Sequence, residues 1–230
     1  MNTTTTALKV VHRLRDKPAA LRFLRTEAGQ LNFSTCLFWQ AGKPDINSIL
    51  SSFRVEGEVA EVGVYFGTFA LCLAKHFPDK EIHLFDTFEG VPEGVICEHD
   101  LSNPNEFHSA GDFNETSVEA VQTLLETHEC HNAIFHKGVF PDTASEVEDK
   151  KFCFVSIDVD FYKPIKAAFE FFYPRMTKGG TIAVYDDYGN PATPGTKKAV
   201  DEFLLDKPES LRLDVADSEA LKSLVYIIKE

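Results

Sequence analysis

The chain has 230 residues, a length that suits one α/β domain with a single large core. Its net charge of −13, with no Lys/Arg stripe, argues against a nucleic-acid partner and against docking on an anionic membrane. The five cysteines show no C-x-x-C spacing, so we expect no disulfide framework. No signal-peptide pattern opens the chain and no apolar run is long enough to span a bilayer, so we expect a cytoplasmic protein.

Residues 1–57 differ in pattern from the rest of the chain. Leucines and valines recur there at roughly helical spacing, which predicts an N-terminal helical extension. Such an apolar extension packs either on the main body or on a second subunit, so a homodimer is one expectation. Residues 58–230 form the second predicted unit, a single catalytic domain.

Strands and helices alternate along this second unit. Strands are expected at 59–63, 81–85, 133–136, 152–157, 180–185, 211–215 and 223–228. Helices are expected at 68–77, after a Thr116–Glu119 capping box, from Pro164 onward and at 196–205. Alternation predicts a mostly parallel, doubly wound sheet, and the last two strands, which lack a helix between them, predict a terminal antiparallel hairpin. This seven-stranded plan is that of the class I S-adenosylmethionine (SAM) methyltransferases, a Rossmann-like α/β fold.

Two pairs of acids each follow a buried strand. Asp158 and Asp160 come after 152–157, and Asp186 and Asp187 come after 180–185. If these strands are neighbours, their carboxyl ends lie about 5 Å apart and the carboxylates converge. Mg²⁺ suits such an all-oxygen set. The alternative is that the aspartates cap helices or bind solvent.

The first strand ends in a turn with the spacing Gly63-x-x-x-Gly67, and Glu61 precedes it. This spacing differs from the G-x-G-x-x-G of dinucleotide folds, and an acid there suits a cationic ammonium or sulfonium better than a pyrophosphate. Asp86 ends the second strand, where an acid can accept hydrogen bonds from ribose hydroxyls. Taken singly, both features are also compatible with ordinary structural turns.

Several motifs in order resemble one known family. They are Glu61–Tyr65, Phe85–Pro92, Gly111–Phe113 leading to Thr116–Glu119, the segment Ser156–Tyr188, and Pro194-Gly195 followed by Lys198–Phe203. Together they cover most of residues 58–205 and resemble the macrocin-type sugar O-methyltransferases (the TylF/MycF family). Val159 departs from the family pattern, in which the middle of the Asp-x-Asp element is usually glycine, and so does Lys163-Pro164.

The resemblance implies a SAM- and Mg²⁺-dependent O-methyltransferase that acts on a small natural product, typically at a deoxysugar hydroxyl. By position, Asp158, Asp186 and Asp187 would hold the metal, and Asp160 would act as the general base. The predicted cofactor-binding residues are Glu61, Gly63, Tyr65, Gly67, Thr68, Asp86, Thr87, Asp112, Phe113, Ser117 and Asp158.

Other functions stay open at this point. A catechol or other phenolic acceptor competes with a sugar hydroxyl. A nicotinamide-dependent oxidoreductase is a second alternative, although the glycine spacing and the lack of an obvious Tyr-x-x-x-Lys pair count against it. A catalytically silent, ligand-binding relative is the third.

Overall fold

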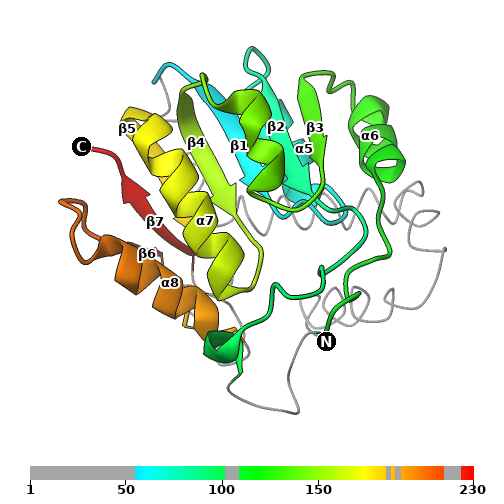
Figure 1. Ribbon diagram of the computed structural model, residues 1–230. Helices are drawn as coiled ribbons and strands as arrows, with labels where there is room; N and C mark the ends of the chain where they lie inside the picture. The colour runs from blue at the N-terminus through cyan, green and yellow to red at the C-terminus, as the bar shows by residue number, and fades with distance from the viewer. Residues whose placement is uncertain (1–54, 102–108, 185–187, 190–192, 215–223) are drawn as a thin grey trace, which may run out of the picture.

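The computed structural model describes residues 55–101, 109–184, 188–189, 193–214 and 224–230 (Figure 1). Seven strands of these residues form one sheet in the order β3-β2-β1-β4-β5-β7-β6. The parallel strands are β1 (Glu58–Val62), β2 (Ile82–Asp86), β3 (Ala133–Lys137), β4 (Phe152–Ile157) and β5 (Met176–Val184). The last pair, β6 (Arg212–Asp214) and β7 (Leu224–Ile228), is antiparallel, and β7 also runs antiparallel to β5. The predicted fold class is confirmed.

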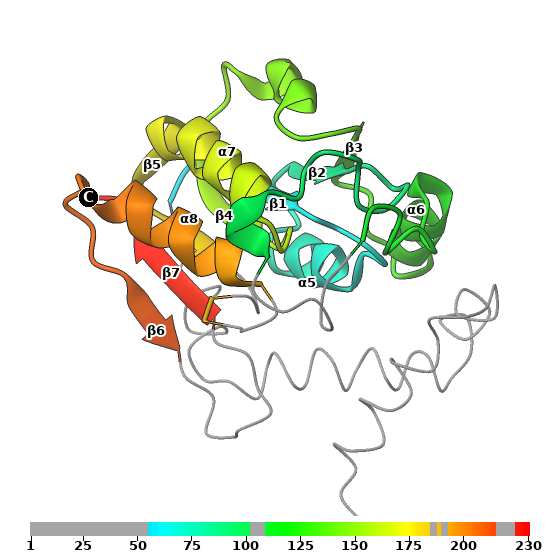
Figure 2. The same ribbon diagram turned by 60° about the horizontal axis from the view of Figure 1, so that its bottom comes forward.

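Helices cover both faces of this sheet. Figure 2 shows α5 (Thr68–His76) on one face, and α7 (Tyr162–Phe172) with α8 (Pro194–Leu204) on the other. α6 (Val118–Thr127) packs beside α5. Consecutive residues of β1 join different cores: Val59 packs with α5 and α6, Ala60 with α7 and α8, and both are fully buried. Coverage on both sides explains why the strands are continuous apolar runs.

The direction in which successive strands are added to the sheet reverses between β1 and β4. From β1 the sheet grows outward through β2 to β3, and from β4 it grows the other way through β5. Open α/β sheets bind ligands outside the carboxyl ends of the strands at such a point. A short helix, η2 (Glu98–Asp100), lies near this edge beside the start of α8 (Figure 1).

The predicted elements agree with the structure except at some boundaries. β5 begins at Met176, earlier than expected, and α8 begins at Pro194. The predicted Thr116–Glu119 capping box is wrong, because Ser117 is the N-cap and its Oγ accepts a hydrogen bond from the Ala120 N–H at 3.1 Å. Thr116 instead donates its hydroxyl to the carbonyl oxygen of Tyr65 at 2.5 Å, a contact between distant segments.

Two predictions concern the N-terminal extension and membrane-spanning segments. The expected N-terminal helical extension lies almost wholly outside the described residues, and the boundary at residue 57 stays a prediction. Among the described residues, no helix combines the length and apolarity needed to cross a bilayer.

A buried histidine pair joins β2 to β3. Nδ1 of His83 lies 2.9 Å from Nε2 of His136, and Nδ1 of His136 lies 2.8 Å from a carboxylate oxygen of Glu146. Both ring nitrogens of His136 therefore have hydrogen-bond partners within the protein. His83 is 1% exposed, and its Nε2 has no hydrogen-bond partner among the described residues, although Glu81 lies 3.6 Å away. Burial, and then the neighbouring His136, lower the pKa of His83 to about 4.

Stability should therefore rise with pH between about 4 and 6.5. In this window His83 binds a proton in the unfolded chain and not in the folded chain, so acid favours unfolding. We expect His83→Gln to reduce the pH dependence of the unfolding free energy, measured by urea denaturation from pH 4 to pH 8. Replacement of the exposed His131 by Gln is the control, and equal slopes in the two variants would contradict the assignment.

Candidate functional site

A glycine turn follows β1 and leads directly into α5. Gly63 has φ +89° and Gly67 has φ +75°, the left-handed conformation that favours glycine. A Cβ on Gly63 would lie 1.8 Å from the carbonyl oxygen of Asp158, and one on Gly67 would lie 2.5 Å from Cγ1 of Val121. The turn is therefore packed without spare room against the end of β4 on one side and α6 on the other.

Asp86, the last residue of β2, holds this turn in place. Its Oδ2 accepts hydrogen bonds from the backbone N–H groups of Val64 at 2.7 Å and Tyr65 at 2.9 Å, and its Oδ1 accepts one from Phe88 at 2.7 Å. Backbone donors at a turn have no ladder partner, so the carboxylate supplies their acceptors. The structure thus gives Asp86 a turn-fixing role, and the ribose contact expected from the sequence stays a prediction.

Glu61 is a buried carboxylate that lies on β1 next to this turn. It is 2% exposed, and its Oε2 makes no hydrogen bond with the described residues. Burial raises the pKa of Glu61 well above its usual value, and the negative charges of Asp158 and Asp86 raise it further. An unpaired carboxylate is costly to bury, and two neighbouring acids increase that cost. Such a site is suited to a cationic group of a ligand.

The loop that carries the predicted cofactor-binding residues Asp112 and Phe113 lies beside the turn. The ring of Phe113 meets the ring of Tyr65 edge-on, with 5.4 Å between the ring centroids. Asp112 accepts hydrogen bonds from Ser109 N–H on its Oδ2 at 2.9 Å and from Val91 N–H on its carbonyl oxygen at 2.8 Å. The structure therefore brings Phe113 next to the glycine turn, although the two are far apart in the sequence.

Three predicted cofactor residues have hydroxyl groups at the ends of elements. Ser117 caps α6, and Thr87 donates its hydroxyl to the carbonyl oxygen of Gly90 at 2.7 Å. Thr68 is the first residue of α5. Their local hydrogen bonds explain Ser117 and Thr87 in structural terms, and cofactor contacts from them stay predictions.

The strands that carry the predicted metal ligands are neighbours. Ile157 of β4 pairs with Val184 of β5, and Asp158 follows Ile157 directly. The Asp158 N–H also donates to the carbonyl oxygen of Val62 at 2.8 Å, which fixes Asp158 beside β1. Asp186 and Asp187 lie outside the described residues. Within the part of the chain that the structure describes, no group of three or more potential metal ligands is gathered.

Asp160, the predicted base, occupies a three-residue turn. The carbonyl oxygen of Val159 accepts a hydrogen bond from the Phe161 N–H at 2.6 Å, and Asp160 between them has φ +60°. The hydroxyl of Thr196, at the start of α8, donates to the carbonyl oxygen of Asp160 at 3.1 Å. The side chain of Asp160 is half-buried, and none of the described residues donates a hydrogen bond to its carboxylate.

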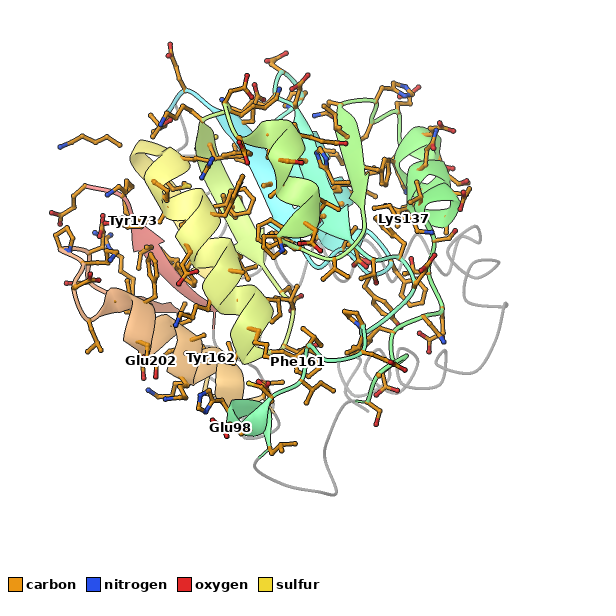
Figure 3. All side chains as sticks on the ribbon, in the orientation of Figure 1. Glu98, Lys137, Phe161, Tyr162, Tyr173 and Glu202 are labelled. Atoms are coloured by element: carbon orange, nitrogen blue, oxygen red, sulfur yellow. The ribbon has the colours of Figure 1, made fainter. Side chains whose placement is uncertain are left out.

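Asp100 is a buried acid bonded to the segment after β4, and the sequence analysis did not single it out. Its side chain is 2% exposed, Oδ1 accepts from the Tyr162 N–H and Oδ2 from the Cys97 N–H, both at 2.8 Å. Figure 3 shows Phe161 and Tyr162 at the start of α7, with Glu98 of η2 nearby. The bond from the Cys97 N–H to Asp100 is local, so a short sequence pattern could indicate it. The bond to α7 spans 62 positions, so no such pattern could.

Comparison with known proteins places this site in context. Residues 45–218 match the model of the family described as macrocin O-methyltransferase (TylF). A tetracenomycin-type 4'-O-methyltransferase of Streptomyces olivaceus, named for a dimethoxy-rhamnosyl substrate, is 26% identical over 141 residues, which are 58% of this chain and 54% of that protein. Demethyldecarbamoylnovobiocin O-methyltransferase of Streptomyces niveus is 24% identical over 171 residues, 71% of this chain and 62% of that protein. The chain thus spans little more than half the length of these curated relatives.

A solved structure is also similar. The calicheamicin methyltransferase CalS11 superposes with a TM-score of 0.69 at 23% identity, covering 98% of this chain and 91% of that chain. An apo structure of CalS11 describes it as a TDP-rhamnose 3'-O-methyltransferase. At this level of identity the likeness shows that the two chains share a fold.

Gly63→Ala should destabilise the protein much more than Gly94→Ala. Both glycines have positive φ, +89° and +76°, so a Cβ costs each about 1–2 kcal/mol in backbone strain. Only Gly63 also has an atom in the way, because nothing lies within 4 Å of a Cβ on Gly94. Thermal or urea unfolding of the two variants measures the difference, and equal losses would show that the contact with Asp158 is unimportant.

Proposed function

Because the chain belongs to the macrocin O-methyltransferase (TylF) family, we propose that it transfers a methyl group from SAM to a hydroxyl of a small natural product. The observation that carries the proposal is Glu61, a buried carboxylate with an unpartnered oxygen at the glycine turn. The methionyl ammonium and the sulfonium of SAM are both cationic, and either relieves the repulsion among Glu61, Asp86 and Asp158.

The same charges count against a nicotinamide cofactor. A dinucleotide places its pyrophosphate at the glycine turn and the helix N-terminus that follows. Here Glu61 is buried next to that turn, and Asp158 and Asp86 lie near enough to raise its pKa. A dianionic pyrophosphate would add to this repulsion, whereas a methyl donor with a positive charge reduces it.

A deoxysugar is the acceptor that the relatives support. One curated relative is named for a rhamnosyl substrate, and CalS11 is described as acting on TDP-rhamnose. We extend the sugar acceptor to this chain as part of the proposal.

The acids at the carboxyl ends of β4 and β5 are proposed to perform the chemistry. Asp158, Asp186 and Asp187 would hold Mg²⁺, because carboxylate oxygens suit this ion and β4 and β5 are neighbours. When bound, the ion would orient the acceptor hydroxyl and lower its pKa. Asp160 accepts the hydroxyl proton while the acceptor oxygen forms a bond to the methyl carbon and the carbon–sulfur bond breaks, so that the sulfur leaves as a neutral thioether.

The proposal also covers the cellular compartment and the oligomeric state of the protein. The cysteines among the described residues, Cys72, Cys97, Cys130 and Cys153, are all free thiols, which supports a reducing compartment such as the cytoplasm. A homodimer through the N-terminal extension also remains our proposal, with the oligomeric state in solution as its test.

Glu61→Gln should separate stability from cofactor binding. Removing a buried negative charge is expected to leave the unfolding temperature unchanged or raised, while the affinity for SAM falls at least about tenfold, or about 1.4 kcal/mol. Calorimetric titration with SAM and with NAD⁺ measures this, and only SAM should bind the unaltered protein. Glu170→Gln, an exposed change on α7, is the matched control. Unaltered SAM affinity in Glu61→Gln, or binding of NAD⁺ in its place, would contradict the proposed cofactor site.

Removing divalent cations should stop methyl transfer without releasing SAM. We expect turnover with TDP-rhamnose to fall at least 100-fold in EDTA and to return on addition of Mg²⁺, because the metal acts on the acceptor and Glu61 on the cofactor. Asp158→Asn should lose the recovery by Mg²⁺, whereas the exposed Asp142→Asn should keep it. Full turnover in chelator would exclude the metal role.

A further inference from the structure

We propose that Thr196 and Asp100 are positioning residues that hold Asp160 in one conformation before the acceptor binds. This inference rests on the proposed function, in which Asp160 is the base. Neither side chain is a predicted metal ligand or base. Both are buried, and together they would fix the conformation of residues 159–162.

The first argument is the conformation of Asp160 itself. A three-residue turn closed by the Val159–Phe161 hydrogen bond, with a positive φ at its centre, is the rare and strained form of the γ-turn. Such strain persists only where the surrounding structure over-determines it, and it is concentrated at functional sites. A turn of the common, negative-φ form would aim the side chain in another direction. The contacts that impose the strained form are therefore candidates for a functional role.

Thr196 is the direct contact. It is fully buried in the first turn of α8, and its hydroxyl donates to the carbonyl oxygen of Asp160. That carbonyl belongs to the peptide between residues 160 and 161, so the bond fixes the orientation of the peptide plane that follows Asp160. The Thr196 N–H bonds to the carbonyl oxygen of Thr193, so the threonine is itself held within its helix turn.

Asp100 fixes the other side of the turn. Its buried carboxylate accepts from the Tyr162 N–H, two residues after Asp160, at the N-terminal end of α7. It also packs against the start of α8, because a Cβ on Gly195 would lie 1.9 Å from its Oδ1. Gly195, which precedes Thr196 in the first turn of α8, has no side chain, and the Asp100 carboxylate occupies the space that one would fill.

Three elements therefore fix one short segment. The β1 strand binds Asp158 through the Val62 carbonyl oxygen, α8 binds Asp160 through Thr196, and η2 binds Tyr162 through Asp100. Between these points the Asp160 carboxylate is left without a donor among the described residues. A group that is held by its backbone and has an uncommitted carboxylate is arranged to receive a proton from a ligand.

The test compares Thr196→Val with Thr196→Ser. Valine keeps the shape and removes the donor, and serine restores the donor. With TDP-rhamnose as acceptor, we expect Thr196→Val to lower kcat at least tenfold with the acceptor KM and SAM affinity changed less than threefold, and Thr196→Ser to recover most of kcat. Thr123→Val on α6, which removes a similar hydroxyl-to-carbonyl bond far from the site, should leave kcat unchanged.

Hydrogen exchange supplies a readout that does not depend on activity. Exchange at the backbone amides of 159–162 should be at least tenfold faster in Thr196→Val and in Asp100→Asn than in the unaltered protein, and normal in Thr196→Ser. Asp100→Asn also covers the case in which Thr196→Val fails to fold. Unchanged exchange at these amides, or an unchanged kcat in Thr196→Val, would overturn the positioning role.

A failure of the proposed function looks different. If the unaltered protein methylates no acceptor, or if Asp160→Asn keeps a normal kcat, the catalytic assignment is wrong whatever the Thr196 variants do. The exchange measurement would still decide whether Thr196 and Asp100 hold the turn.

Discussion

The site depends on a backbone contact between the ends of two adjacent parallel strands. Val62 of β1 accepts a hydrogen bond from Asp158, which follows β4, and Gly63 lies so close to the Asp158 carbonyl that no side chain fits there. This contact joins the two halves of the proposed chemistry, since the glycine turn follows β1, and Asp158 and Asp160 follow β4. Any change that separated the two strand ends would move the cofactor side away from the acceptor side.

The same closeness creates an electrostatic cost. Glu61, Asp86 and Asp158 come from three neighbouring strands, and Glu61 is buried among them with an oxygen that no described residue satisfies. A protein selected for stability alone would replace Glu61 with a neutral residue. Its presence is understandable if a cationic ligand supplies the missing partner, which is the balance between stability and function expected at binding sites.

Asp86 illustrates how one residue type can serve two purposes. Its position at the end of β2 agrees with a role in ribose binding, and yet its Oδ2 accepts two backbone hydrogen bonds that shape the glycine turn, and its Oδ1 accepts a third from Phe88. Position along a strand predicts that an acid lies at the ligand edge. It does not predict which donors the acid will meet, because two of the three, the N–H groups of Val64 and Tyr65, belong to the turn that follows the neighbouring strand β1.

The amino-acid sequence by itself determined the elements, the parallel sheet with its antiparallel end, and the edge of the sheet at which Asp86 and Asp158 lie. These follow from periodicity and from the polar residues that end apolar runs, which are local properties. Only the tertiary structure decided that Ser117 rather than Thr116 caps α6, that Asp100 binds the start of α7, and that Thr196 holds Asp160. The Ser117 cap is a local bond, but the bond from Thr116 to Tyr65 spans 51 positions, and the bonds to Asp100 and from Thr196 span 62 and 36 positions. Such distant partners are selected by the packing of elements that lie far apart in the sequence, and no pattern within a short stretch of sequence records them.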